Sequence, residues 1–362
     1  MAQNTFLPPE LNKRVVSLDV FRGFIMFTML IGTFGLKELA HYPVAGFVYN
    51  QLTHAPWRGF HFEDVILPSF LFIIGVAMAL STSKRRSQGE DNKKKLRHAV
   101  RRSAALFLMG FLLSWISARK PYFGAGVLQI LAISYFFAYL FIEKSIKVQY
   151  SIFAVLLFIY WFFIFIVPVP EAGRNSYVLY KNLVYYLDDI IIGSATRWGY
   201  LYTIITSIAV VVYGSIIGKI LLNRSSNKEF MKMLAILGTA GVVAGLALNP
   251  VIPIIKRMFT PSYTLFTCGL VTLMLLGFFW LIDIKGHVKW SFPFIVFGAN
   301  SIFVYMLNML FSSWLMEKGG IFIAPLEPFI GAWASPATHL LRMLALWLVC
   351  FWLYRRKLFF KI

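Results

Sequence analysis

Ten runs of mainly apolar residues divide this chain of 362 residues, and they decide what it can fold into. A helix that crosses a bilayer needs about 20 consecutive apolar residues. A soluble domain cannot keep ten such runs away from water at once. We therefore predict an all-α integral membrane protein with about ten transmembrane helices. The runs lie at residues 15–36, 62–83, 100–118, 125–142, 149–167, 199–221, 233–252, 263–284, 292–316 and 337–354.

The composition supports a membrane protein. Hydrophobic residues make up 59% of the chain and charged residues only 14%, whereas soluble proteins carry about 25% charged residues. Cys268 and Cys350 lie inside apolar runs, so we expect neither a disulfide framework nor a bound metal. The first run is too long for a cleavable signal peptide. With no linker or short repeat in view, we predict one polytopic domain over residues 1–362.

The distribution of lysine and arginine predicts the orientation of the runs. These residues collect in the cytoplasmic loops of membrane proteins. Counted on alternate sides, 23 of them fall on the side of the N-terminus and 10 on the other side. We therefore expect both termini in the cytoplasm. The segments 37–61, 168–198 and 317–336 then lie on the outer face, and the basic loop 84–102 lies in the cytoplasm.

The formal net charge of +20 has a second interpretation, which is nucleic-acid binding. No finger, RNP box or basic helix with a dimerisation heptad accompanies the charge, so we expect no nucleic-acid partner. The loop 84–102 holds nine lysines and arginines. This density favours a topogenic signal or contact with anionic membrane lipids. Attraction of a polyanionic cytoplasmic cofactor is the alternative.

A few polar residues lie where they are costly. Asp19 and Arg22 share a helix face at the start of the first run, where they form either a snorkelling anchor pair or part of a site. The amides of Gln129 and Asn300 are typical of packing contacts between membrane helices.

Two histidines and two carboxylates lie close together just before the second run. His54 and His61 precede Glu63 and Asp64 on the predicted outer side. Imidazole is the usual general base near neutral pH, and an adjacent carboxylate can fix its tautomer. The alternative is a set of interfacial residues beside Trp57.

These polar positions fall in sequence blocks that resemble a known family. The blocks resemble, in the same order, the transmembrane acyltransferase family of heparan-α-glucosaminide N-acetyltransferase and its bacterial relatives. The blocks are Ser17-Leu-Asp-Val-Phe-Arg-Gly, His54-Ala-Pro-Trp-Arg-Gly, Asp64-Val-Ile-Leu-Pro-Ser-Phe-Leu-Phe-Ile-Ile-Gly, Gly126-Val-Leu-Gln, Lys256 followed by Ser262 and Tyr263, Asp283-Ile-Lys-Gly, and Gly298-Ala-Asn-Ser-Ile-Phe-Val-Tyr.

The resemblance implies an acetyl transfer across the membrane. In this family cytoplasmic acetyl-coenzyme A is the donor, and the acceptor is the amino group of a hexosamine on the far side. It also implies a homodimer in a bacterial inner membrane. The active-site histidine of the family matches His54, which the charge count independently places outside. Two alternatives stay open: O-acetylation of an envelope glycan, and a small-solute or lipid carrier.

Three positions depart from the family pattern. Thr33 stands where the family has an asparagine, Ile130 where it has an arginine, and Asn308 where it has a histidine. A threonine hydroxyl offers one hydrogen-bond donor where an amide offers two. The resemblance therefore predicts the class of reaction, acyl transfer, more specifically than it predicts the acceptor or the acyl group.

We assign roles to the site residues on this basis. His54 is the expected base, Asp64 orients it, and Thr33 donates to the oxyanion. Around the coenzyme, Arg22 and nearby cytoplasmic cations face the phosphates. The remaining residues expected to line the coenzyme site are Asp19, Gln129 and Asn300, and those expected to bind the acceptor are Trp57, Lys256 and Ser262.

Overall fold

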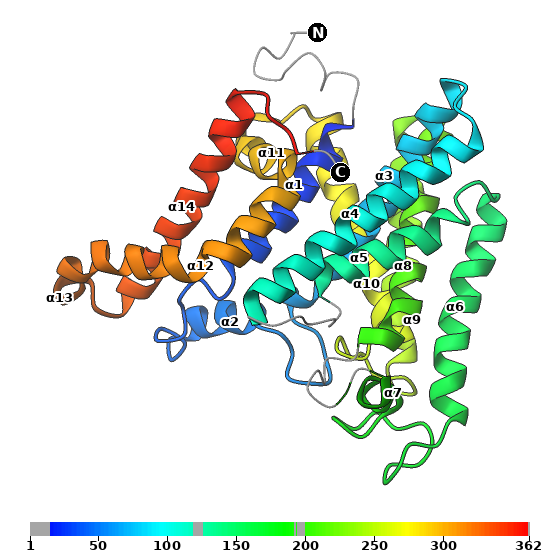
Figure 1. The fold of residues 1–362 in the computed structure, drawn as a ribbon, viewed down its shortest axis with the longest axis horizontal. Coiled ribbons are helices and arrows are strands. Elements are labelled where there is room, and N and C mark those ends of the chain that lie inside the picture. The colour runs from blue at the N-terminus through cyan, green and yellow to red at the C-terminus, as the bar shows by residue number, and fades with distance from the viewer. Residues whose placement is uncertain (1–14, 119–125, 192, 194–199, 361–362) are drawn as a thin grey trace. The chain divides into compact units, whose positions relative to one another are not determined.

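The computed structural model of the protein describes residues 15–118, 126–191, 193 and 200–360 (Figure 1). Regular structure in these ranges is helical, apart from two isolated β-bridges that join Val169 to Gly173 and Val178 to Lys181. The all-α prediction is therefore confirmed for the part of the chain that is described. Part of the predicted outer segment 168–198 and the first residues of the predicted spans 125–142 and 199–221 lie outside it.

Seven helical stretches in the described ranges have the length and hydropathy of membrane spans. Four of the ten predicted runs account for the difference of three. The first run forms a helix of 16 residues, Val16–Ile31, and the fourth forms one of 13 residues, Val127–Tyr139. The last two runs belong to one nearly continuous helical stretch, Ser301–Arg355. A multi-pass membrane protein is supported, while the count of about ten and the orientation stay predictions.

The chain divides into two compact units. Unit 1 comprises Met1–His54, His61–Ile66 and Met274–Lys361, and unit 2 comprises Ala55–Phe60 and Leu67–Leu273. The single polytopic domain expected from the sequence stays a prediction. The helices of unit 1 are α1 (Val16–Ile31), α2 (Pro43–Gln51), the 3-10 helix η2 (Phe62–Val65), the π-helix η3 (Phe279–Ile284), η4 (Lys289–Ser291), α11 (Phe292–Ala299), α12 (Ser301–Ile323), η5 (Ala324–Leu326), α13 (Glu327–Ile330), η6 (Gly331–Trp333) and α14 (Ala334–Arg355).

Unit 2 holds the remaining helices, and two of them continue into unit 1 at one end. Its core lies where α6 packs on α8, with the rings of Tyr160 and Tyr202 4.5 Å apart. The helices are α3 (Ile66–Ser87), α4 (Asn92–Ala118), α5 (Val127–Tyr139), α6 (Ile146–Ile166), α7 (Leu183–Ile191), α8 (Tyr200–Leu222), α9 (Asn227–Leu248) and α10 (Pro261–Phe278).

Glycines let helices approach closely in both units. In unit 1, Gly23 of α1 faces the backbone of Phe294 in α11, and Gly298 faces the carbonyl of Asp19. In unit 2, Gly75 of α3 faces a backbone carbonyl of α8. Small residues at such crossings are typical of membrane helices, which gain contact area when their backbones come together.

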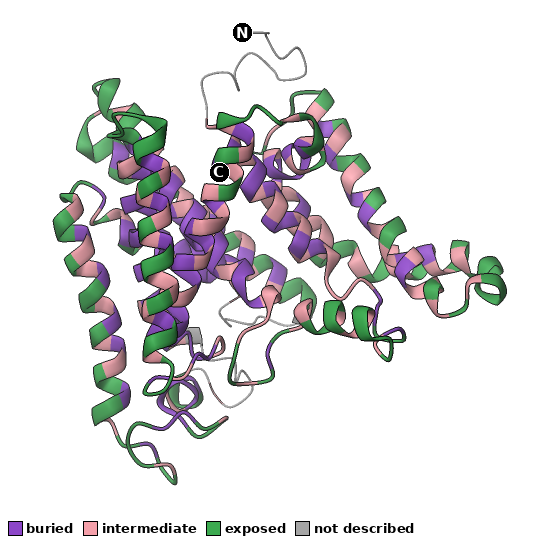
Figure 2. Ribbon diagram, turned by 180° about the vertical axis from the view of Figure 1, so that it is seen from behind, coloured by how far each residue is buried: buried purple, intermediate pink, exposed green. Residues whose placement is uncertain are grey.

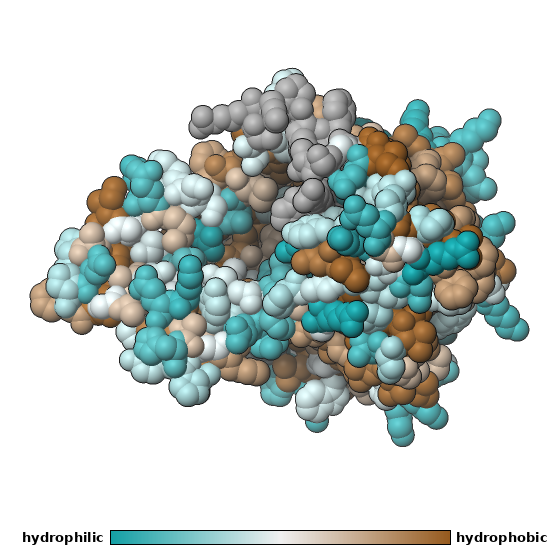
Figure 3. Space-filling view, turned by 90° about the horizontal axis from the view of Figure 1, so that it is seen from below, coloured by the Kyte–Doolittle hydropathy of each residue, from teal (hydrophilic) through white to brown (hydrophobic). Residues whose placement is uncertain are grey.

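Large apolar side chains remain exposed along several helices. Figure 2 shows exposed positions along the length of α6. The exposed side chains of this helix include Val155, Phe158 and Phe162. Hydrophilic and apolar side chains are interspersed on the face drawn in Figure 3. A soluble protein rarely exposes so many large apolar side chains, whereas a bilayer covers them.

Two helices differ from the predicted runs, for local reasons. The run 15–36 stops being helical at Ile31, because Gly32 takes φ = 53°, a conformation that favours glycine. The run 292–316 contains a break at Asn300, which separates α11 from α12.

Candidate functional site

The centre of the candidate site in unit 1 is a histidine and an aspartate. Nδ1 of His54 lies 3.1 Å from Oδ1 of Asp64. The Asp64 side chain is fully buried, whereas 49% of the His54 side chain is exposed. A buried carboxylate beside Nδ1 favours the tautomer that carries its proton there. In that tautomer the other ring nitrogen, Nε2, is the proton acceptor.

The loop around the pair is held by short-range hydrogen bonds. The other carboxylate oxygen of Asp64 accepts from the backbone N–H of His61 at 2.9 Å, which caps η2. Nδ1 of His61 lies 3.0 Å from the carbonyl of Thr53. The side chain of Gln51 accepts from the N–H of Phe62 at 3.1 Å. Asp64 is thus fixed from both sides, and His61 has a positioning role that sequence reasoning did not assign.

The spacing of His61 and Asp64 carries the signal for that role. A residue at a helix start and an acid three positions later form a capping box when their side chains and backbones exchange hydrogen bonds. Histidine is an unusual first member, so the sequence pattern alone did not single it out.

Thr33, the expected oxyanion donor, lies in the turn that follows α1. Its carbonyl accepts from the N–H of Leu36 at 3.1 Å. The other departures from the family pattern are Asn308, which lies in α12, and Ile130, which is buried in α5. The role of Thr33 stays a prediction.

Arg22 is tied to the break between α11 and α12. Its Nη2 donates to Oδ1 of Asp19 at 2.9 Å, and its Nε donates to the carbonyl of Gly298 at 2.9 Å. A carbonyl at the end of a helix lacks an intrahelical partner. Arg22 satisfies that carbonyl, and Asp19 balances its charge, so both residues first of all hold α1 against α11.

Asn300 fixes the break from the other side. Its amide nitrogen donates to the carbonyl of Leu358 at 3.1 Å, and its oxygen accepts from the N–H of Phe360 at 2.9 Å. The residue is 1% exposed. These contacts bind the C-terminal segment of unit 1, and they are the visible role of the Gly298-Ala-Asn block.

Asp283 caps α1 from η3. Its two oxygens accept from the backbone N–H groups of Val16 and Ser17, each at 3.2 Å. A carboxylate at a helix N-terminus also complements the helix dipole. The Asp283-Ile-Lys-Gly block therefore anchors the start of the helix that carries Asp19 and Arg22.

The other expected site residues lie in unit 2. Gln129 of α5 is buried, and its amide nitrogen donates to the hydroxyl of Ser114 at 3.3 Å. Nε1 of Trp57 donates to the carbonyl of Tyr177 at 2.8 Å. Ser262 is buried, and its hydroxyl lies 3.2 Å from that of Thr260.

Trp57 and the segment before α10 pack into one cluster of unit 2. Trp57 packs against a core that includes Ile255 and Met258, which flank Lys256. The N–H of Gly59 donates to the carbonyl of Ile254 at 2.9 Å. The structure therefore brings together the neighbourhoods of Trp57 and Lys256, two of the residues expected to bind the acceptor.

The phenol of Tyr177 completes this neighbourhood. Burial raises the pKa of Tyr177 to about 12, because the charged phenolate is poorly solvated there. This phenol therefore stays neutral at physiological pH and is not a candidate proton acceptor.

No group of three or more histidine, cysteine, aspartate or glutamate side chains with the spacing of a metal site occurs among the residues that the structure describes.

Known proteins match this chain over most of its length. Residues 14–248 match the family model described as "Heparan-alpha-glucosaminide N-acetyltransferase, catalytic". The chain is 26% identical over 434 aligned residues to heparan-alpha-glucosaminide N-acetyltransferase of Homo sapiens, and 25% identical over 423 to that of Mus musculus. The alignments cover 98% and 96% of this chain but 60% of each relative. The chain thus spans about three fifths of the length of these relatives.

Proposed function

Because the chain belongs to the heparan-alpha-glucosaminide N-acetyltransferase catalytic family, we propose that it transfers an acetyl group from acetyl-coenzyme A to the amino group of a glucosamine-type sugar. The single observation that carries the proposal is the pair of His54 and Asp64. The imidazole is half exposed and can meet a substrate, while its partner is buried and fixed. Such a pair is the usual arrangement of an oriented general base.

The proposed step needs a base and an oxyanion donor. The amine nitrogen attacks the carbonyl carbon of the thioester, and the carbon–sulfur bond breaks as the amide forms. Nε2 of His54 takes the proton that the amine loses and passes it to the departing thiolate of coenzyme A. Base catalysis of this kind contributes about 10²–10⁴-fold. Asp64 stabilises the imidazolium that forms, and Thr33 is the proposed donor to the oxyanion.

Arg22 is the proposed contact for the phosphates of coenzyme A. Its hydrogen bonds within the protein use Nε and Nη2, and 33% of the side chain is exposed. Among the described residues none accepts a hydrogen bond from Nη1, which can therefore donate to a phosphate oxygen. A planar guanidinium suits this contact. In this proposal Asp19, Asn300 and Gln129 act by holding the helices that shape the site.

The acceptor is proposed to lie near Trp57, Lys256 and Ser262. An indole face suits the apolar face of a sugar ring, and polar groups beside it suit the hydroxyls. Loop 37–61, which carries His54, is proposed to face the exterior or the periplasm of a bacterial cell. The donor would then come from the cytoplasm and the acceptor from outside.

The test is a transfer assay with purified protein in nanodiscs, where both faces are accessible. Radiolabelled acetyl-coenzyme A and glucosamine are supplied, and the product is identified by mass spectrometry, which separates an amide from an ester. We expect His54→Ala to lower the rate by roughly 10²-fold or more, because the base is lost.

His41→Ala is the matched control. His41 is an exposed histidine of the same unit, with Nδ1 2.9 Å from the carbonyl of Glu38. Its replacement should leave the rate unchanged. Full transfer by His54→Ala would overturn the assignment of His54 as the base. An ester product would show that the acceptor group is a hydroxyl and not an amine.

A further inference from the structure

A pocket of about 520 Å³ opens at one end of unit 2, where the ends of α3 and α8 meet the start of α6. Pockets of this volume hold small ligands. It shares no residue with the proposed transfer site. The polar residues of its wall include Thr82 and Arg86 of α3, Glu143, Lys144 and Lys147 around the start of α6, and Lys219 of α8.

The wall of the pocket is strongly positive. Four of its residues, Arg86, Lys144, Lys147 and Lys219, are cationic, and only Glu143 is anionic. Among the described residues, no carboxylate lies within ion-pair distance of the three lysines. The nearest recorded contact of Lys219 is a hydrogen bond from Nζ to the carbonyl of Lys144, at 2.5 Å. An excess of cations over anions in a concave site concentrates anions.

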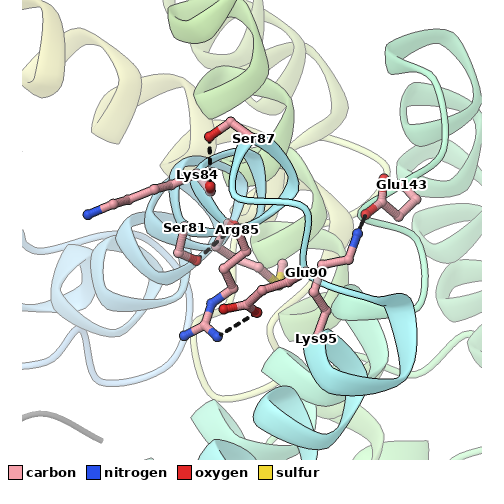
Figure 4. Close-up of polar contacts among 8 residues, drawn as sticks. Ser81, Lys84, Arg85, Ser87, Glu90, Lys95 and Glu143 are labelled. Carbon is pink, nitrogen blue, oxygen red and sulfur yellow. Dashed lines mark hydrogen bonds and ion pairs between the residues drawn. The ribbon is translucent and has the colours of Figure 1, made fainter.

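The one carboxylate is already engaged. Oε1 of Glu143 lies 3.1 Å from Nζ of Lys95, whose side chain is only 6% exposed, and Oε2 lies 3.7 Å from Nη1 of Arg86. Figure 4 shows Lys95 of α4 reaching Glu143, which lies in the segment after α5. Glu143 also acts on Lys219 through its charge, but one carboxylate shared with Lys95 and Arg86 leaves the wall of the pocket with a net positive charge.

The start of α6 adds backbone donors to this wall. The N-cap residue is Ser145. Its hydroxyl accepts a hydrogen bond from the N–H of Val148, and its carbonyl accepts one from the N–H of Gln149. Ile146 and Lys147 occupy the first helical positions and line the pocket. The N–H groups at these positions have no partner inside the helix and, with the helix dipole, attract oxygen anions.

The rest of the wall is apolar. Ala79, Ile142, Ile146 and Leu222 contribute alkyl surface, and 43% of Leu222 is exposed. The charge count assigns this end of the helices to the cytoplasm, where anionic lipids concentrate. A ligand with a phosphate and an adjacent apolar group would meet both parts of the wall.

We propose that this pocket binds a phosphate ester, held by Lys147, Lys219 and the first N–H groups of α6. Two sources share this chemistry: the head group of an anionic phospholipid and a soluble phosphate ester. The pocket shares no residue with the proposed transfer site, so the binding test and the transfer assay can fail independently of each other.

The test measures binding to the purified full chain in a neutral detergent by native mass spectrometry. The probes are phosphatidylglycerol, phosphatidylcholine and glycerol 3-phosphate. We expect phosphatidylglycerol to bind better than phosphatidylcholine, and Lys147→Gln to weaken that binding roughly tenfold, because a charge-assisted contact is lost. Binding of phosphatidylglycerol alone assigns a lipid, and equal binding of glycerol 3-phosphate assigns any phosphate ester.

Lys94→Gln is the matched control, since Lys94 is an exposed lysine of α4 in the same unit that does not line the pocket. It should change binding little. The thermal unfolding of each variant is recorded, and Arg86→Gln replaces Lys147→Gln if the latter unfolds. Equal weakening by Lys94→Gln, equal binding of phosphatidylcholine, or no binding of any probe overturns the proposal.

Discussion

At the scale of single residues, the proposed mechanism makes Asp64 the residue that orients His54. Its carboxylate accepts the N–H of His61 with one oxygen and lies beside His54 with the other. Replacing it by asparagine keeps an oxygen for the N–H of His61 but presents an amide to the imidazole. A neutral amide does not stabilise an imidazolium, and its NH₂ group favours the wrong tautomer.

We therefore expect Asp64→Asn to lower kcat by about 10²–10⁴-fold, with a smaller change in KM. The measurement is the transfer assay, with thermal unfolding as a check on folding. The double variant with His54→Ala should lose no more activity than His54→Ala alone, because both residues serve one proton transfer.

Glu63→Gln is the control for charge, since it removes the neighbouring carboxylate. It should leave kcat within about twofold of the wild type, because the carboxylate beside the imidazole of His54 is that of Asp64. Equal losses from Glu63→Gln and Asp64→Asn would mean that the charge of the loop matters and the pair does not.

At the scale of helices, the crossing of α1 and α11 depends on Gly23. A Cβ atom there would lie 1.7 Å from the carbonyl oxygen of Phe294, which is backbone and cannot rotate away. The helices would have to separate, and the hydrogen bond from Arg22 to Gly298 would be strained. Overpacking of this kind costs about 1–3 kcal/mol or more.

Gly23→Ala should therefore lower the Tm of the protein by several degrees. Gly277→Ala is the control in the same unit, because no atom beyond the chain neighbours and the local helix backbone lies within 4 Å of the added methyl group. Since alanine favours a helix over glycine, Gly277→Ala should keep or slightly raise the Tm. Similar Tm values for the two variants would show that the crossing is not tight.

The helices also mark what could be predicted from sequence. Length and hydropathy located the long helices, because both are properties of a local window. The break at Asn300 was not predicted, since it depends on contacts with Leu358 and Phe360, which lie far along the chain. For the same reason Arg22 was expected to meet a cofactor, whereas its visible partners are Asp19 and a helix carbonyl.

The candidate site was predictable only in part. His54 and Asp64 stood out because imidazole and carboxylate near a predicted helix start suggest proton transfer, and the structure places them together. The capping by His61 and the basic pocket around Lys219 escaped notice, because each is assembled from hydrogen bonds or helix ends that sequence spacing does not reveal.

At the scale of the whole molecule, the proposed reaction needs the two ends of unit 1 on opposite sides of a bilayer. Helix α1 starts at residues capped by Asp283, near the 285–291 loop, and ends at Ile31, before the segment that carries His54. Its 16 residues span about 24 Å. Lysine and arginine counts of 23 and 10 predict that the Asp283 end lies in the cytoplasm.

Cysteine labelling tests this orientation, because the two native cysteines, Cys268 and Cys350, are buried and should react slowly. Asn50 of α2 and His287 of the 285–291 loop are exposed positions of unit 1. In intact cells, a membrane-impermeant maleimide should label Asn50→Cys at once and His287→Cys only after permeabilisation. The reverse pattern would place His54 on the cytoplasmic side, where acetyl-coenzyme A and the base would share one compartment and no transfer across the bilayer would be needed.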